Sequence, residues 1–136
     1  MTDTSGVRIT FAGGVGTVTG ANFLLESPIG TKFLIDCGLV QGEKVALPEN
    51  SEAFPYEPAS IQALFITHAH LDHVGRIPKL VREGFKGPIY STPQTKALAE
   101  LVLNDAVSIM AAEAMHEGIA PLYGLEDVQK VFHNLK

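Results

Sequence analysis

Short runs of β-branched and aromatic residues, separated by turn residues, fill the first two thirds of the chain and predict strands. Five strands are expected, at residues 7–12, 18–27, 32–36, 63–67 and 88–91. The run 63–67 is almost wholly apolar, which is typical of a strand buried on both faces of its sheet. Gly14 and Gly16 predict a tight hairpin between the first two strands. Residues 41–60 are rich in proline and glutamate and predict a solvated loop.

Apolar residues repeat every three or four positions later in the chain, which predicts helices. A short helix is expected at 77–83. A long helix is expected to begin after Thr92, with Pro93 in its first turn, and to end near Gly118. Its expected buried face consists of Leu98, Leu101, Val102, Ile109 and Met110. With a third helix at 125–135, the pattern predicts a domain of mixed α/β (α+β) type, in which helices pack on a mixed sheet.

Composition and charge narrow the possible functions. The chain has 136 residues, enough for one domain, and a formal net charge of −5, which argues against binding nucleic acid by charge alone. A single cysteine, Cys37, excludes an internal disulfide and fits a reducing compartment. The first residues show no basic segment followed by an apolar one, and the apolar stretch 98–115 is interrupted by carboxylates. We therefore expect a cytoplasmic protein without a membrane span.

The candidate chemistry lies directly after the apolar strand 63–67, where three of the five histidines fall within residues 68–73. Imidazole and carboxylate groups are ligands for zinc and other divalent first-row metals. His68 and His70 are two residues apart, so in an extended backbone they point the same way and can hold one ion. Asp72 and His73 follow where the chain turns, and there they can face a second ion nearby. These four residues are the predicted metal ligands.

The spacing His68-x-His70-x-Asp72-His73 resembles the metal-binding motif of the metallo-β-lactamase superfamily. Asp36, at the end of the strand 32–36, is similar to the superfamily's first motif, whose aspartate orients the histidine loop. The flanking segments 14–22 and 75–90 resemble the β-CASP branch, which contains RNA-processing nucleases similar to the cleavage and polyadenylation specificity factor. The resemblance implies an αββα sandwich, of which residues 1–136 form only the N-terminal half.

This resemblance implies a hydrolase that cleaves RNA phosphodiester bonds with a metal-bound hydroxide held by two zinc ions. Asp72 and His73 are implied as catalytic as well as metal-binding residues. Complete members of the family add a further histidine and a bridging aspartate from later motifs, and they carry a β-CASP domain. His116 and His133 do not lie in such motifs. We therefore expect residues 1–136 alone to be an incomplete and inactive part of the enzyme.

Four of the ten basic residues follow the histidine motif closely: Arg76, Lys79, Arg82 and Lys86. Their spacing of three and four residues places them on one side of the helix expected at 77–83. Such a patch can hold phosphates beside the metal site, with Arg76 and Lys79 as the candidate contacts. The alternative is a solvated helix face without a ligand.

Two other functions remain open from the sequence. A metallo-hydrolase of the same fold can act on a small molecule such as a thioester or lactone, although the segment 75–90 favours RNA because it matches the RNA-processing branch. Alternatively, the chain is a non-catalytic fragment that associates with a partner. In each case the missing second half leaves sheet surface uncovered, so self-association through the sheet is expected.

Overall fold

The computed structural model of the chain describes residues 6–42 and 48–136. Part of the predicted loop 41–60 and the first five residues, on which the expectation of no secretory signal rests, therefore lie outside the described residues. The described part of that loop contains a short helix, α1 (Pro48–Ser51), and a 3₁₀ turn at Pro58–Ser60. It is therefore less irregular than its proline content indicates.

All five predicted strands form, and they build one mixed sheet in the order β1-β2-β3-β4-β5. Their bounds are β1 Arg8–Gly13, β2 Asn22–Glu26, β3 Lys32–Ile35, β4 Ala63–Phe65 and β5 Ile89–Tyr90. The first three strands are antiparallel and the last three are parallel. The second strand starts at residue 22 and not at 18, because the hairpin turns through positive φ angles at Gly14, Gly16 and Gly20.

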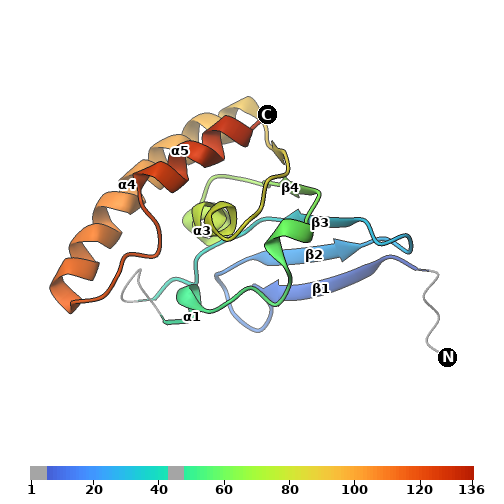
Figure 1. Cartoon of the computed structure of the whole chain (residues 1–136), viewed down its shortest axis with the longest axis horizontal. Helices are drawn as coiled ribbons and strands as arrows, with labels where there is room; N and C mark the ends of the chain where they lie inside the picture. Colours follow the sequence, from blue (N-terminus) through green and yellow to red (C-terminus); the bar gives the residue numbers. More distant parts are fainter. Residues whose placement is uncertain (1–5, 43–47) are drawn as a thin grey trace.

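The predicted helices also form: α3 Ile77–Arg82, α4 Pro93–Glu117 and α5 Leu125–Asn134, with a further single turn, α2 Leu71–Val74, inside the histidine motif. The ends of α4 follow the predicted capping chemistry. The Thr92 side chain accepts a hydrogen bond from the Thr95 N–H, and Gly118 ends the helix with φ 68°. Figure 1 shows α4 and α5 on the same side of the sheet.

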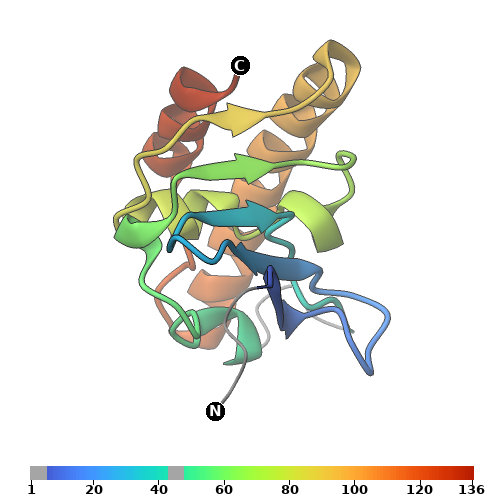
Figure 2. The same cartoon turned by 90° about the vertical axis from the view of Figure 1, so that its right-hand side faces the viewer.

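The sheet has one covered face and one open face. A row of directly paired residues faces the helices and is almost fully buried: Leu24, Leu34, Leu64 and Ile89. In Figure 2 the strands lie in front of α4 and α5, so the helices cover only the far side of the sheet. This is the architecture expected for half of an αββα sandwich, with one helical layer on one sheet.

Aromatic residues dominate the open face. The paired row here runs Phe11, Phe23, Ile35, Phe65 and Tyr90. Phe65 stacks on Tyr90 with ring centroids 5.4 Å apart, and Phe11 meets Phe23 edge-on at 5.9 Å. Phe11 is 61% exposed and Phe65 43%. A contiguous exposed apolar surface of this kind is typical of a face that packs against another layer.

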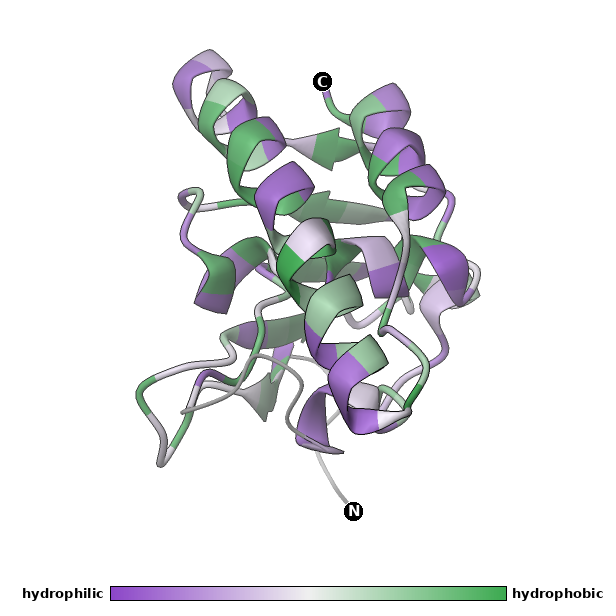
Figure 3. Cartoon of the chain, turned by 90° about the vertical axis from the view of Figure 1, so that its left-hand side faces the viewer, coloured by the Kyte–Doolittle hydropathy of each residue, from purple (hydrophilic) through white to green (hydrophobic). Residues whose placement is uncertain are grey.

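The predicted buried face of α4 was wrong for three of its members. Leu98, Leu101 and Ile109 are exposed, Val102 is half-buried, and only Met110 faces the core. The buried positions are Thr95, Ala99, Leu103, Ala106, Met110 and Ala114. Small alanines let α4 lie close to α2 and α5, Leu103 and Met110 fill the core between them, and Leu98, Leu101 and Ile109 remain outside. Figure 3, seen from the helical side, shows apolar positions distributed along the whole of α4.

Candidate metal centre

Two parallel strands bring the candidate site together. β3 and β4 are paired in parallel, with Ile35 opposite Phe65, so both strands end at the same edge of the sheet. Asp36 follows β3 directly, and Thr67 with the histidines follows β4. In open sheets with parallel strands, functional side chains collect at these carboxyl ends. The positions of the two motifs therefore follow from strand order and register.

The Asp36 carboxylate contacts both Thr67 and His73. Its Oδ1 accepts from the Thr67 N–H at 2.8 Å, and its Oδ2 accepts from the Thr67 hydroxyl at 2.7 Å. Oδ2 also lies 2.7 Å from Nδ1 of His73. Asp36 is 1% exposed and has φ 57°, a left-handed conformation that costs about 1–3 kcal/mol for a residue with a side chain. The hydrogen bonds hold Asp36 in that conformation, and the predicted proximity to the histidine loop is confirmed.

The three imidazole rings gather beside Asp36. The ring centroids of His68 and His73 lie 4.0 Å apart, and those of His68 and His70 lie 4.7 Å apart. Asp72 joins them, with its Oδ2 3.5 Å from Nε2 of His73. Among residues 6–42 and 48–136, however, no three His, Cys, Asp or Glu side chains are placed so that they would hold a metal ion as they stand. The four predicted ligands converge without forming a finished site.

The donor set nevertheless fits zinc. Three imidazoles and one carboxylate are the ligands of catalytic zinc sites, which differ from the cysteine-rich structural ones. The contact between Nδ1 of His73 and Asp36 fixes the ring and leaves Nε2 as the atom available to an ion. A metal-binding histidine commonly pairs its other ring nitrogen with a carboxylate in this way. The arrangement agrees with a metal-binding loop in which the buried Asp36 carboxylate orients the His73 ring.

The backbone of the histidine motif is fastened to two other segments. The N–H groups of Leu39, Ala21 and Cys37 donate to the carbonyl oxygens of Leu71, Asp72 and His73 at 2.8 to 2.9 Å. Gly38 lies so close to this turn that a β-carbon on it would be 1.7 Å from the Asp72 oxygen. Only glycine permits this approach.

A family model described as "Metallo-beta-lactamase superfamily" matches residues 15–131 of the chain. This range contains Asp36 and the whole histidine motif. The chain belongs to this superfamily. It is 42% identical over 130 residues to ribonuclease TTHA0252 of Thermus thermophilus, covering 96% of this chain and 28% of that protein. It is also 39% identical over 112 residues to transcription termination factor FttA of Methanosarcina mazei, covering 79% of this chain and 17% of that protein.

The similarity to these two proteins confirms the predicted resemblance to the RNA-processing branch of the superfamily. The chain spans less than a third of the length of each. Among solved structures, a subclass B3 metallo-β-lactamase from a soil metagenome library is 19% identical, with a TM-score of 0.48, over 66% of this chain and 32% of that one. Within the described residues, no helix is long and apolar enough to cross a membrane.

The two side chains predicted to contact phosphate face the interior of this superfamily member. Arg76 is 7% exposed and Lys79 is 4% exposed. Nε of Arg76 donates to the Gly38 carbonyl at 2.6 Å, and Nζ of Lys79 pairs with Glu83 at 2.7 Å. Both cations also lie over the ring of Phe54. They help to hold the loops around the histidine motif, so the expectation that they form a surface patch with Arg82 and Lys86 was wrong.

The structure adds positioning residues that the sequence did not single out. The Asn22 side chain donates to the Asp36 carbonyl at 2.8 Å and accepts from the Tyr56 hydroxyl at 2.8 Å. The Tyr123 hydroxyl donates to the Gly75 carbonyl at 2.7 Å. Burial raises the pKa of Tyr56 and of Tyr123, so both hydroxyls remain hydrogen-bond donors at neutral pH. Thr67, which opens the histidine motif, and Asn22, which ends the segment 14–22, stood where sequence reasoning could have found them.

The remaining thiol and the two remaining histidines do not add to the histidine motif. Cys37 is fully buried beside Asp36, and burial raises the pKa of its thiol to about 12. His116, near the end of α4, and His133, on α5, are exposed.

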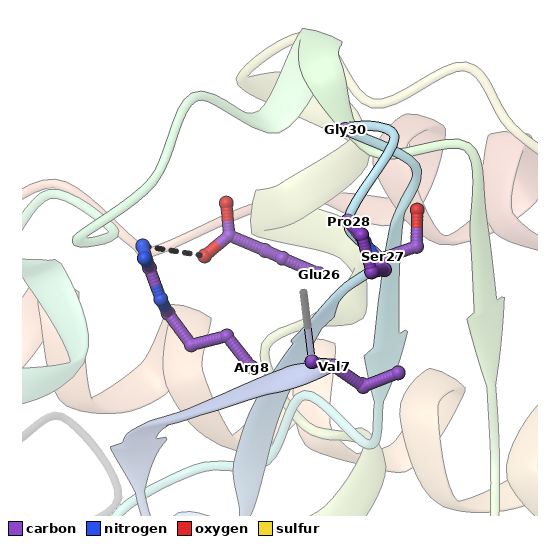
Figure 4. Close-up of a pocket in the computed structure, with 7 residues that line it drawn as sticks. Val7, Arg8, Glu26, Ser27, Pro28 and Gly30 are labelled. Carbon is purple, nitrogen blue, oxygen red and sulfur yellow. Dashed lines mark ion pairs between the residues drawn. The ribbon is translucent and has the colours of Figure 1, made fainter. Parts of the chain in front are cut away.

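Two surface pockets differ in their relation to the site. One lies beside the histidine motif, lined by Gln41, Ala69, His70, Leu71, Asp72 and Val102. The other, shown in Figure 4, lies where β1 begins and β2 ends, and Arg8 and Glu26 form an ion pair in it at 3.9 Å. β2 ends opposite the start of β3, so the second pocket is at the other edge of the sheet. Only the first pocket contains predicted ligands.

Proposed function

We propose that this chain supplies the metal-binding loop of a zinc-dependent hydrolase that cleaves RNA phosphodiester bonds. The observation that carries the proposal is the gathering of three imidazoles and Asp72 beside Asp36, with the Asp36–His73 contact at 2.7 Å. The choice of RNA rests on the similarity to a protein named as a ribonuclease and to transcription termination factors.

In this proposal His68, His70, Asp72 and His73 hold two zinc ions. Bound zinc lowers the pKa of a coordinated water and polarises a phosphoryl oxygen. Asp36 orients His73 through Nδ1, and Thr67 fixes the Asp36 carboxylate by two hydrogen bonds. In this proposal Asp72 and His73 are also the catalytic residues; both are half-buried, and Asp72 lines the pocket on the side that contains His70. A phosphodiester group would enter from that side.

We further propose that residues 1–136 by themselves bind zinc weakly, with one ion, and show little hydrolysis. Catalytic zinc normally has three protein ligands and one open position. Four ligands shared by two ions leave both ions with too few, and a bridging carboxylate would be needed to reduce the repulsion between the cations.

We also propose that the isolated chain self-associates through the open sheet face, which buries its row of exposed aromatic side chains. The site of action proposed for the protein is the cytoplasm, where the single thiol of Cys37 stays reduced.

A chimera tests the RNA proposal. Residues 6–136 of this chain replace the aligned segment of ribonuclease TTHA0252, which is 42% identical to it. We expect the chimera to cleave single-stranded RNA, and we expect Asp72→Asn in the same chimera to reduce cleavage about 100-fold or more. A folded chimera that binds zinc but hydrolyses a thioester or lactone and no RNA would support the small-molecule alternative. A folded, zinc-loaded chimera without either activity would refute the proposal.

A further inference from the structure

The turn that carries Asp72 and His73 depends on the rest of the molecule for its shape. α2 has four residues, and a helix of that length is not stable by itself. Its position is set by the packing of Val74 in the core and by hydrogen bonds from outside to the peptide carbonyls of the turn and its cap. The carbonyls with such partners are those of Leu71, Asp72, His73 and Gly75. Three of the four donors are backbone N–H groups, and the fourth is the hydroxyl of Tyr123.

Tyr123 reaches this turn from a distant part of the chain. It lies between α4 and α5 and is 48 residues away from Gly75 in sequence. Its side chain is 1% exposed and belongs to the hydrophobic core, so the ring has little freedom to move. The hydroxyl donates at 2.7 Å to the carbonyl of the residue that caps α2 at its C-terminal end. Gly75 is buried as well, so water does not readily replace this donor.

We propose that Tyr123 is a positioning residue for the metal-binding turn, which its hydroxyl holds at the Gly75 carbonyl so that Asp72 and His73 keep their places as ligands. The inference rests on the proposed metal-binding function of that turn. The hydrogen bond acts at the C-terminal end of α2, where His73 is two residues away from Gly75 and Asp72 is three residues away. Tyr123 does not touch the ions or the substrate.

The effect follows from the geometry. Without the hydroxyl, the Gly75 carbonyl has lost its donor inside the core, and the end of α2 relaxes toward another partner. Loss of a group that orients a metal ligand typically lowers metal affinity about 10- to 100-fold. Tyr123 acts through the backbone and not on a ligand side chain directly, so we expect the lower limit, about tenfold.

The experiment compares the chain with its Tyr123→Phe variant, which removes the hydroxyl and keeps the ring. Co²⁺ is titrated as a visible probe of the zinc site, and amide hydrogen exchange at His73, Val74 and Gly75 is measured in the metal-free protein. We expect about tenfold weaker Co²⁺ binding in the variant and faster exchange at those three amides. Tyr90→Phe, which removes a hydroxyl from the open sheet face, is expected to change neither.

A second control separates positioning from a general loss of stability. Val128→Ala opens space at a buried position of α5 and destabilises the fold without removing a bond to α2. If Tyr123→Phe leaves Co²⁺ affinity and exchange unchanged, or if Val128→Ala weakens Co²⁺ binding as much, the inference is overturned. If the unmodified chain binds no Co²⁺, the proposal that residues 1–136 hold one metal ion by themselves fails. Hydrogen exchange then still shows whether Tyr123 fixes the turn.

Discussion

Gly38 offers the sharpest perturbation of the metal-binding turn, because its α-carbon packs against the peptide between Asp72 and His73. In Gly38→Ala the new β-carbon would lie 1.7 Å from the Asp72 carbonyl oxygen and 2.0 Å from its carbonyl carbon. Few real β-carbons approach a neighbour within 3.4 Å, so the two segments must separate by more than an ångström. Disturbing the groups that place metal ligands typically lowers metal affinity about 10- to 100-fold, and a displacement of more than an ångström belongs at the upper limit, about 100-fold. We expect a loss of that order in metal affinity.

The assay is a Co²⁺ titration of the purified chain, with thermal unfolding measured in parallel. Overpacking of this kind destabilises by about 1–3 kcal/mol, so the variant is expected to unfold at a lower temperature. The matched control is Gly124→Ala, where an added β-carbon meets nothing within 4 Å and φ is −118°. A folded Gly38→Ala protein with unchanged metal affinity and unchanged thermal midpoint would refute the reasoning from close approach.

Three further predictions concern the site, the open face and the cysteine. Asp36→Asn should weaken Co²⁺ binding about 10- to 100-fold, because the amide no longer offers His73 a carboxylate; equal affinities would contradict the orienting role. Phe11→Ser with Phe65→Ser should make the chain monomeric in light scattering, whereas the unmodified chain should form dimers or larger species; a monomeric unmodified chain would contradict self-association. Cys37, with a pKa of about 12, should react with a thiol reagent at pH 8 only after unfolding; rapid reaction in the folded chain would show that it is accessible.

Local sequence determined the strands and the helix ends, and it supplied the candidate metal ligands. Turn residues and β-rich runs fix strand positions because they act over a few residues, and Thr92 and Gly118 fix the ends of α4 by satisfying its terminal N–H and carbonyl groups. The histidine motif could be recognised for the same reason, since the four proposed ligands lie within six residues of one another. The start of β2 was misplaced because glycines in the hairpin permit positive φ angles where the composition suggested a strand.

Tertiary packing decided what periodicity leaves open. α4 has apolar residues on more than one side, so the pattern alone could not show that Ala99 and Leu103 face the core while Leu98 and Leu101 face outward. The buried side of α4 carries the alanines that allow close approach to α2 and α5, together with Leu103 and Met110.

The positioning contacts of the metal-binding turn were equally out of reach of the sequence. The Arg76 side chain points inward because it donates to the Gly38 carbonyl, 38 residues away in sequence. The hydrogen bond from Tyr123 to Gly75 joins residues 48 positions apart. A single chain shows which residues are able to bind a metal because that property belongs to the side chain. Which residues hold those ligands in place is decided by contacts between segments that meet only in the folded molecule.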